Sequence, residues 1–173
     1  MTETTRPGVT GTAELQGAFR EVMAGVCTPV SVVTALADGL PHGTTVSAFA
    51  SLSMSPPMVL VSLDRGSVLL ARVRETRRFG LNVLASGQAD LALRFAGKGE
   101  DRFAGVGWTS RHEVPCLDGS GGFLACDVAE IVEGGDHLVL LGEVRCAEVF
   151  TGSPLTYYGR TFGTHSSLDD ASG

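Results

Sequence analysis

The chain has 173 residues, a length typical of one domain with a single core. Its 43% hydrophobic content, 23 glycines and 18% charged residues exclude a disordered chain and indicate a compact, turn-rich fold. Thirteen basic and 19 acidic residues give a net charge of −6, which argues against a nucleic-acid face or an anionic-membrane surface.

The first ordered element is expected to be a helix that begins at Thr12, after a flexible tail over residues 1–11. Apolar side chains recur there at helical spacing and predict one stripe that covers a barrel end. The stripe consists of Leu15, Ala18, Phe19, Val22, Met23 and Val26. Because the chain has neither a leader pattern nor a run of about 18 apolar residues, we expect a cytoplasmic protein.

Two extended segments predict a hairpin: residues 30–36 and residues 42–49 flank the turn dipeptide Asp38-Gly39. The second arm opens a stretch, residues 43–63, that is rich in hydroxyl and small side chains. Such a stretch lets a flat ligand approach backbone amides, and the alternative is an edge strand with a solvated face. The Pro56-Pro57 pair then redirects the chain into an apolar strand over residues 58–63.

Helices are expected over residues 68–75, with Ser67 as N-cap and with Val68, Leu69 and Val73 facing inward, and over residues 88–96. Between them, residues 79–84 predict a strand with Asn82 in its middle. Asn is depleted from strand interiors, so Asn82 is either half-exposed or hydrogen-bonded to something specific.

Residues 123–132 and 137–149 predict a second hairpin, and residues 155–162 predict a last strand before a flexible tail at 166–173. Six or seven strands with short links and three helices favour a mainly β fold, an antiparallel barrel, in one domain over residues 12–165. The four scattered cysteines predict reduced core thiols rather than disulfides or a metal site.

Four patterns occur in order along the chain: G-x-T-x-S-x-x-x-S-x-S-x-x-P-P from Gly43, F-x-x-N-x-L from Phe79, G-D-H from Gly135, and P-L-x-Y-Y-x-R-x-F-G from Pro154. Together they resemble the flavin reductase-like family over residues 15–164. The resemblance implies an antiparallel Greek-key split β-barrel that forms a homodimer, binds FAD or FMN near the subunit interface, and supplies reduced flavin to a separate monooxygenase.

The resemblance also implies site residues, each with a structural alternative. The flavin is expected against residues of the hydroxyl-rich stretch and against Asn82. The residues of that stretch are Thr45, Val46, Ser47, Ala48, Ser51, Leu52 and Ser53. Ser67 at a helix start suits a flavin phosphate, with a plain N-cap as the alternative. Lys98, Arg102 and Phe103 are expected at the phosphate or the adenylate, although surface cations explain the two charges equally well.

His137, at a strand start, is expected beside the nicotinamide and the flavin ring, where it orients the reactants, and the alternative is a solvated turn histidine. Tyr158, Gly159 and Arg160 match a nicotinamide-contacting segment, and the alternative is an edge strand with polar tips. We therefore expect an NADH-dependent flavin reductase, with NADPH disfavoured by the few basic residues. The competing hypotheses are a non-catalytic flavin- or heme-binding module and a related flavin-dependent oxidase.

Overall fold

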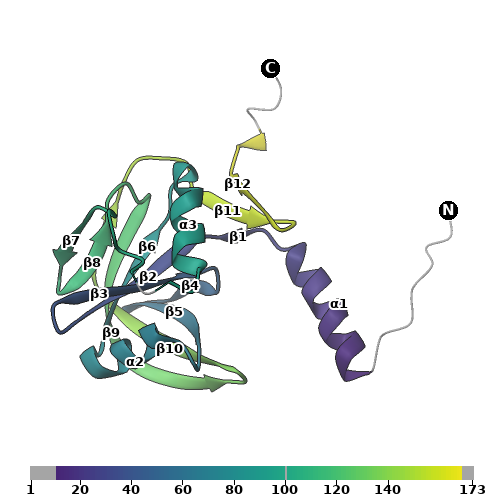
Figure 1. Ribbon diagram of the computed structural model, residues 1–173, viewed down its shortest axis with the longest axis horizontal. Helices are drawn as coiled ribbons and strands as arrows, with labels where there is room; N and C mark the ends of the chain where they lie inside the picture. The colour runs from purple at the N-terminus through teal and green to yellow at the C-terminus, as the bar shows by residue number, and fades with distance from the viewer. Residues whose placement is uncertain (1–10, 100, 169–173) are drawn as a thin grey trace.

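A computed structural model describes residues 11–99 and 101–168. The expected antiparallel split β-barrel is confirmed: seven strands form one curved sheet in the order β3-β2-β6-β9-β10-β5-β4 (Figure 1). In chain order they are β2 (Ser31–Ala37), β3 (Leu40–Val46), β4 (Phe49–Met54), β5 (Pro57–Asp64), β6 (Arg78–Val83), β9 (Gly122–Gly134) and β10 (His137–Val149). The tails expected at residues 1–11 and 166–173 lie mostly outside the described residues.

Both predicted hairpins are confirmed. Asp38 (φ 53°) and Gly39 (φ 74°) form the two-residue turn between β2 and β3, with Ala37 paired to Leu40. Positive φ at both positions is the geometry that matches strand twist and that Asp-Gly adopts readily. The second hairpin joins β9 to β10, with Gly134 paired to His137. Local turn chemistry thus sets the starting register of two of the six strand pairings in this sheet.

The second arm of the first hairpin is shorter than expected. β3 ends at Val46, the link of Ser47 and Ala48 follows, and β4 then pairs with β5 at the opposite end of the sheet order. Ala48 O accepts the amide hydrogen of Ser62 at 2.9 Å, which ties the link to β5. The predicted change of direction at the Pro56-Pro57 pair is confirmed, because Ser55 and Pro56 connect β4 to β5.

Short helices cover the barrel. α2 (Val68–Thr76) packs against β2 and β3 and buries Leu69 and Val73 as predicted, but the expectation for Val68 is wrong, because this first helical residue is 67% exposed. α3 (Ala89–Ala96) follows the one-turn helix η1 (Ser86–Gln88) and packs against β3. A small hairpin of β7 (Trp108–Arg111) and β8 (Val114–Leu117) closes another part of the surface.

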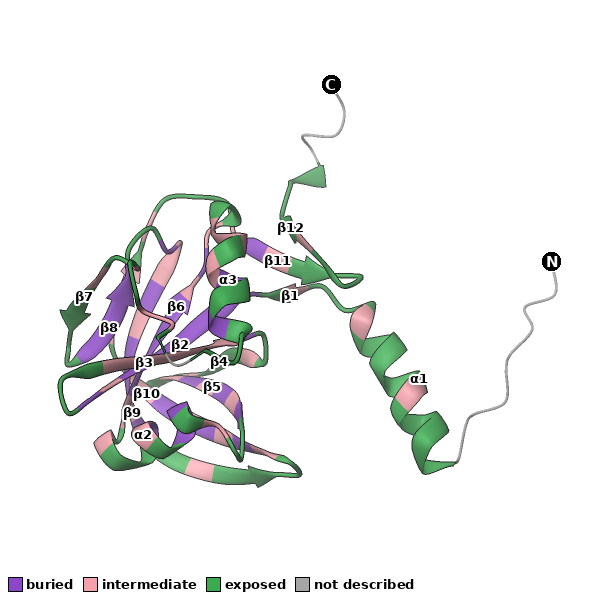
Figure 2. Cartoon of the chain, in the orientation of Figure 1, coloured by how far each residue is buried: buried purple, intermediate pink, exposed green. Residues whose placement is uncertain are grey.

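Figure 2 shows the buried residues gathered inside the barrel. The largest cluster surrounds Phe79, which is fully buried. Cys116 and Cys126 are buried free thiols, as predicted, whereas the free thiol of Cys27 is exposed and Cys146 is half-buried. Burial raises the pKa of Cys126 to about 12, so this thiol stays protonated and acts as a core residue.

An arm extends away from the barrel (Figure 1). It consists of α1 (Thr12–Ala24) and a three-stranded sheet in the order β1-β11-β12. These strands are β1 (Thr28–Pro29), β11 (Leu155–Tyr158) and β12 (Thr161–Thr164), so the single last strand expected from the sequence is a hairpin. The described residues contain twelve strands, more than the six or seven predicted. The strands that were not predicted separately include β4, the β7–β8 hairpin and the short strands of the arm.

The predicted helix α1 is present, but its expected role as a barrel lid is wrong. Phe19 is 62% exposed and Val22 is 68% exposed, and the helix buries none of its residues against the described chain. The N-cap residue is Gly11 rather than Thr12. An amphipathic pattern identifies a face to be covered, but it does not identify what covers it. No helix within residues 11–99 and 101–168 is long and apolar enough to cross a bilayer.

Candidate functional site

A cavity of about 720 Å³ opens beside the edge strand β3, at the seam between β3 and β5. This volume is in the range of sites that bind cofactors. Its walls are β3 and the following link, the end of β5, the start of α2, a loop after α3 and the first residue of β10. The lining residues are Pro41, His42, Gly43, Thr44, Thr45, Val46, Ser47, Ala48, Ser62, Leu63, Asp64, Gly66, Ser67, Val68, Leu69, Gly99, Asp101, Arg102, Phe103 and His137.

The hydroxyl-rich segment forms one wall of this cavity, as far as Ala48. The Thr45 hydroxyl donates to Ala92 O at 2.6 Å, and the Thr44 hydroxyl donates to Phe95 O at 3.4 Å, both on α3. These two hydroxyls therefore fasten β3 to α3. Ser47, in the link, also lines the cavity, and its hydroxyl makes no such bond to the described residues, so the link is the part of the wall that presents small polar groups.

Arg102 holds a second wall in place. One terminal guanidinium nitrogen donates to Gly43 O at 2.9 Å and to Phe95 O at 3.1 Å. Phe103 packs edge-to-face on Phe95, with ring centroids 4.9 Å apart. The Nε atom of Arg102 is buried and has no hydrogen-bond partner within the described chain. A buried charged donor without a protein partner is available to an acceptor from a ligand or from water.

The loop before α2 forms a third wall. Asp64 Oδ1 accepts the amide hydrogen of Gly66 at 2.7 Å, and Asp64 O accepts that of Ser67 at 3.0 Å. Ser67 occupies the predicted N-cap position, but its side chain makes no capping hydrogen bond to the described residues. The first amide groups of α2 therefore face the cavity without a side-chain acceptor, an arrangement that favours an anion.

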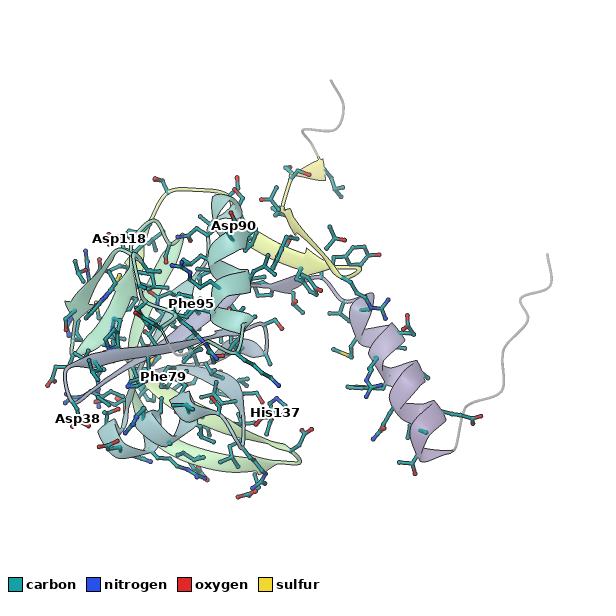
Figure 3. The ribbon with its side chains drawn as sticks, viewed as in Figure 1. Asp38, Phe79, Asp90, Phe95, Asp118 and His137 are labelled. Carbon is teal, nitrogen blue, oxygen red and sulfur yellow. The ribbon has the colours of Figure 1, made fainter. Side chains whose placement is uncertain are left out.

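His137 is the first residue of β10 and lines the cavity, in agreement with its predicted place at a strand start beside a cleft (Figure 3). Its Nδ1 lies 2.8 Å from Asp136 Oδ1. This hydrogen bond lowers the pKa of Asp136, which stays ionised. Because Asp136 engages Nδ1, the other ring nitrogen, Nε2, is the one available to a ligand.

His42 was missed by the sequence analysis. It lies on β3 two residues before Thr44, and so on the same face of the strand, and it lines the cavity. Burial, and then the positive charge of Arg72 on α2, lower its pKa, which favours the neutral imidazole. Its strand alternation with Thr44 was the available signal. Asp64 and Asp101, two further lining residues, carried no such signal in the sequence.

The structure does not bring Asn82 to the cavity, where a flavin contact was expected. Its side chain is fully buried in the sheet and away from the cavity. The amide nitrogen lies 3.2 Å from both Val32 O and Thr34 Oγ1, and the amide oxygen accepts the Leu117 N–H at 2.8 Å. Asn82 therefore joins β6 to β2 and β8, which is the specific hydrogen bonding that an Asn inside a strand requires.

Other predicted residues are not brought to the cavity by a single chain. Ser51, Leu52 and Ser53 lie on β4 at a bulge in its pairing with β5. Lys98 is exposed next to the lining residue Gly99. A further group, Tyr158, Gly159 and Arg160, forms the β11–β12 turn on the arm, where Arg160 pairs with Glu21 of α1.

The residues of the cavity fit a flat cofactor with a phosphate. The free amides of α2 and the unpartnered Nε of Arg102 are both donors for an anion. The small residues Ser47 and Ala48 allow a ring to approach the backbone, and His137 lines the same cavity.

Comparison with known proteins gives a consistent result. Residues 23–166 match the model of the flavin reductase like domain. The reductase component of a 4-nitrophenol 4-monooxygenase/4-nitrocatechol 2-monooxygenase from Rhodococcus opacus is 42% identical over 145 residues, which are 84% of this chain and 78% of the relative. The actinorhodin polyketide dimerase of Streptomyces coelicolor is 40% identical over 159 residues, which are 90% of each chain.

A solved structure is similar along nearly the whole chain. It is the NADH:FAD oxidoreductase SgcE6 from Streptomyces globisporus, in complex with NAD and FAD fragments. The TM-score is 0.85 at 30% sequence identity, and the match covers 94% of this chain and 99% of that one.

Proposed function

The chain belongs to the flavin reductase-like family and is a flavin reductase, and from that premise we propose that it transfers hydride from NADH to FAD or FMN in the cavity beside β3. The reduced flavin then passes to a separate monooxygenase. The observation that carries the proposal is one cavity lined by His137, by the free amides of α2 and by Arg102. Four free cysteines suit a reducing compartment, and we place the protein in the cytoplasm.

The cofactor supplies the redox chemistry, because a bound flavin accepts a hydride from a reduced nicotinamide. The protein supplies binding and orientation. The amides at the start of α2, beside Ser67, and the Nε of Arg102 bind the flavin phosphate through charge-assisted hydrogen bonds. Ser47 and Ala48 hold the ring close to the backbone, where amide groups tune its electron affinity.

His137 orients the nicotinamide. Asp136 engages Nδ1, which leaves Nε2 available to the ligand. Since hydride transfer needs two rings in contact rather than a protein acid, correct placement is the main contribution of this residue.

NADH is proposed over NADPH on the basis of charge. Arg102 is the one Arg or Lys that the described cavity lining contains, whereas Asp64 and Asp101 are two carboxylates. A 2′-phosphate requires additional cations, and the nearby Lys98 is exposed to solvent.

A homodimer is proposed as the functional unit. The apolar stripe of α1, with Phe19 and Val22 at its centre, is exposed in a single chain. A contiguous exposed apolar stripe marks an interaction surface. The arm carries Tyr158, Gly159 and Arg160, and the dimer would bring these residues to the cavity of the partner subunit.

Anaerobic mixing of the purified protein with NADH and either FAD or FMN tests the activity. Both the nicotinamide and the flavin absorbance should bleach, and NADPH should act more slowly. Binding of flavin without bleaching would instead support a non-catalytic flavin or heme module. Because one relative is named a polyketide dimerase, flavin reduction has to be measured directly. Bleaching with a different small-molecule donor and not with NADH would support an oxidase.

A further inference from the structure

Two separate loops meet at the mouth of the cavity. One is the loop from Asp64 to Ser67, between β5 and α2, and the other is the β9–β10 turn, residues 133–136, which leads into His137. The first loop supplies the anion-binding amides, and the second carries Asp136, whose carboxylate contacts the His137 ring. Arg65 belongs to the first loop and contacts the second.

Arg65 makes three contacts with the turn. Its backbone N–H donates to Asp136 O at 3.1 Å. Its Nε donates to Gly135 O at 2.7 Å. A terminal nitrogen of its guanidinium group forms an ion pair with Glu133. The planar guanidinium group thus contacts two points of the turn that are two residues apart.

The two loops differ in how they are supported. The Asp64–Ser67 loop is held by its own hydrogen bonds, from Gly66 N to Asp64 Oδ1 at 2.7 Å and from Ser67 N to Asp64 O at 3.0 Å. The turn contains Gly134 and Gly135, and Gly135 has φ 72°. Strand pairing holds Gly134 and His137 on either side of the turn, whereas Gly135 and Asp136 lie between the strands, where glycine gives the backbone more freedom. Arg65 therefore fixes the turn relative to the loop.

We propose that Arg65 is a positioning residue for hydride transfer, which acts by holding the turn before His137 against the anion-binding loop. The proposal rests on the proposed role of His137 at the nicotinamide. With Arg65 in place, the position that binds the flavin phosphate and the position that orients the nicotinamide are held at a fixed separation. The backbone of His137 is held by pairing with Asp64 and Gly134, so loss of the Arg65 side chain loosens Gly135 and Asp136, and with Asp136 the contact that orients the His137 ring.

A role in global stability is not expected. The side chains of Arg65 and Glu133 are 44% and 72% exposed, and exposed ion pairs contribute little to stability. Loss of Arg65 should therefore leave the melting temperature and the flavin affinity nearly unchanged. The rate of hydride transfer, which depends on sub-ångström placement of the rings, should fall.

The test compares Arg65→Gln, Arg65→Lys and Glu133→Gln with the wild-type protein. Arg74→Gln is the matched control, because Arg74 is an exposed arginine of α2 outside the cavity lining. Stopped-flow single turnover should show that Arg65→Gln reduces bound flavin about tenfold more slowly, while the flavin Kd changes less than about twofold. Arg65→Lys, which retains one charge, should recover part of the rate, and Glu133→Gln should have the smaller effect because the Gly135 O bond remains.

A second readout does not depend on activity. Hydrogen–deuterium exchange at the amides of residues 133–137 should be faster in Arg65→Gln, while exchange in α2 stays as in the wild type. Unchanged exchange at the turn, or an unchanged rate of flavin reduction, would overturn the proposal. Loss of flavin binding together with the rate would also overturn it, because Arg65 would then support the loop. If the wild type fails to reduce flavin, the proposed function is wrong, and the exchange result still tests the contact.

Discussion

The Arg102 guanidinium allows the phosphate site to be tested with a pair of ligands. FMN carries a phosphate that riboflavin lacks, so the ratio of their dissociation constants isolates interactions with the phosphate. Nε of Arg102 is buried and unpartnered in the described chain and belongs to the cavity lining. We expect Arg102→Gln to weaken FMN binding while leaving riboflavin binding nearly unchanged.

The magnitude follows from the bond that is lost. A hydrogen bond to a charged group contributes about 1.5–3 kcal/mol, which corresponds to about 10- to 100-fold in Kd. Because Arg102 is half-buried rather than fully buried, the lower end applies, about tenfold in the ratio. The terminal nitrogen of Arg102 also donates to Gly43 O and Phe95 O, so a modest loss of stability accompanies the change.

Calorimetric titration of the wild type and of Arg102→Gln with FMN and with riboflavin measures the ratio. Arg94→Gln is a matched control, because Arg94 donates to Ala104 O at 2.7 Å and does not line the cavity. An equal loss of affinity for both ligands would refute the reasoning, since Arg102 would then act only by shaping β3 through its bond to Gly43 O.

Four further predictions follow from the geometry. His137→Gln should slow NADH-driven flavin reduction about 10- to 100-fold, with flavin affinity nearly unchanged. Phe19→Asp should raise the dissociation constant of the proposed dimer in sedimentation equilibrium, because the exposed stripe of α1 loses its central apolar residue. Gly142→Ala should lower the free energy of unfolding by about 1–3 kcal/mol in urea titration, because its Cβ would lie 2.7 Å from Phe79 Cε1. The pKa of His42 lies below its ordinary value of 6.5, so the unfolded chain takes up a proton first, and stability should fall as pH drops below 6.5, less so in His42→Asn.

Each of these changes has a control. Arg20→Ala alters an exposed residue beside the stripe of α1 and should leave the dimer intact. Gly87→Ala adds a Cβ that meets nothing within 4 Å and should leave stability unchanged. His112→Asn removes an exposed histidine and should keep the wild-type pH dependence. A loss of flavin binding in His137→Gln would show that His137 contacts the flavin rather than the nicotinamide.

Local signals in the sequence predicted much of the fold. The Asp38-Gly39 dipeptide specified its hairpin because both residues adopt positive φ with little cost. The pairing of β4 with β5 was not predictable in the same way, because Ser47 and Ala48 carry the chain from one end of the sheet order to the other, and no local pattern encodes a crossing. The same limit explains α1, whose apolar stripe was identified but whose partner was not.

The candidate site was predicted in part for the same reason. His137 and Arg102 were identified through the family resemblance, and Ser67 also through its place at a helix start; all three line the cavity. Asn82 was correctly singled out as unusual, but its partners lie on β2 and β8, far away in sequence. The role of Arg65 depends on a turn 70 residues later in the chain, and only the folded structure brings the two together.

The seam between β3 and β5 has a consequence for how fast a ligand exchanges. β4 pairs with β5 from Pro57 to Val61, so Ser62, Leu63 and Asp64 continue beyond the reach of β4 and face the cavity. Within the described residues, β3 does not pair with this end of β5. Widening of the seam therefore strains the hydrogen bond from Ser62 N to Ala48 O rather than a ladder of backbone hydrogen bonds, which keeps the barrier to ligand escape low. A reductase that passes its reduced flavin to a separate monooxygenase needs a site from which the flavin can dissociate readily.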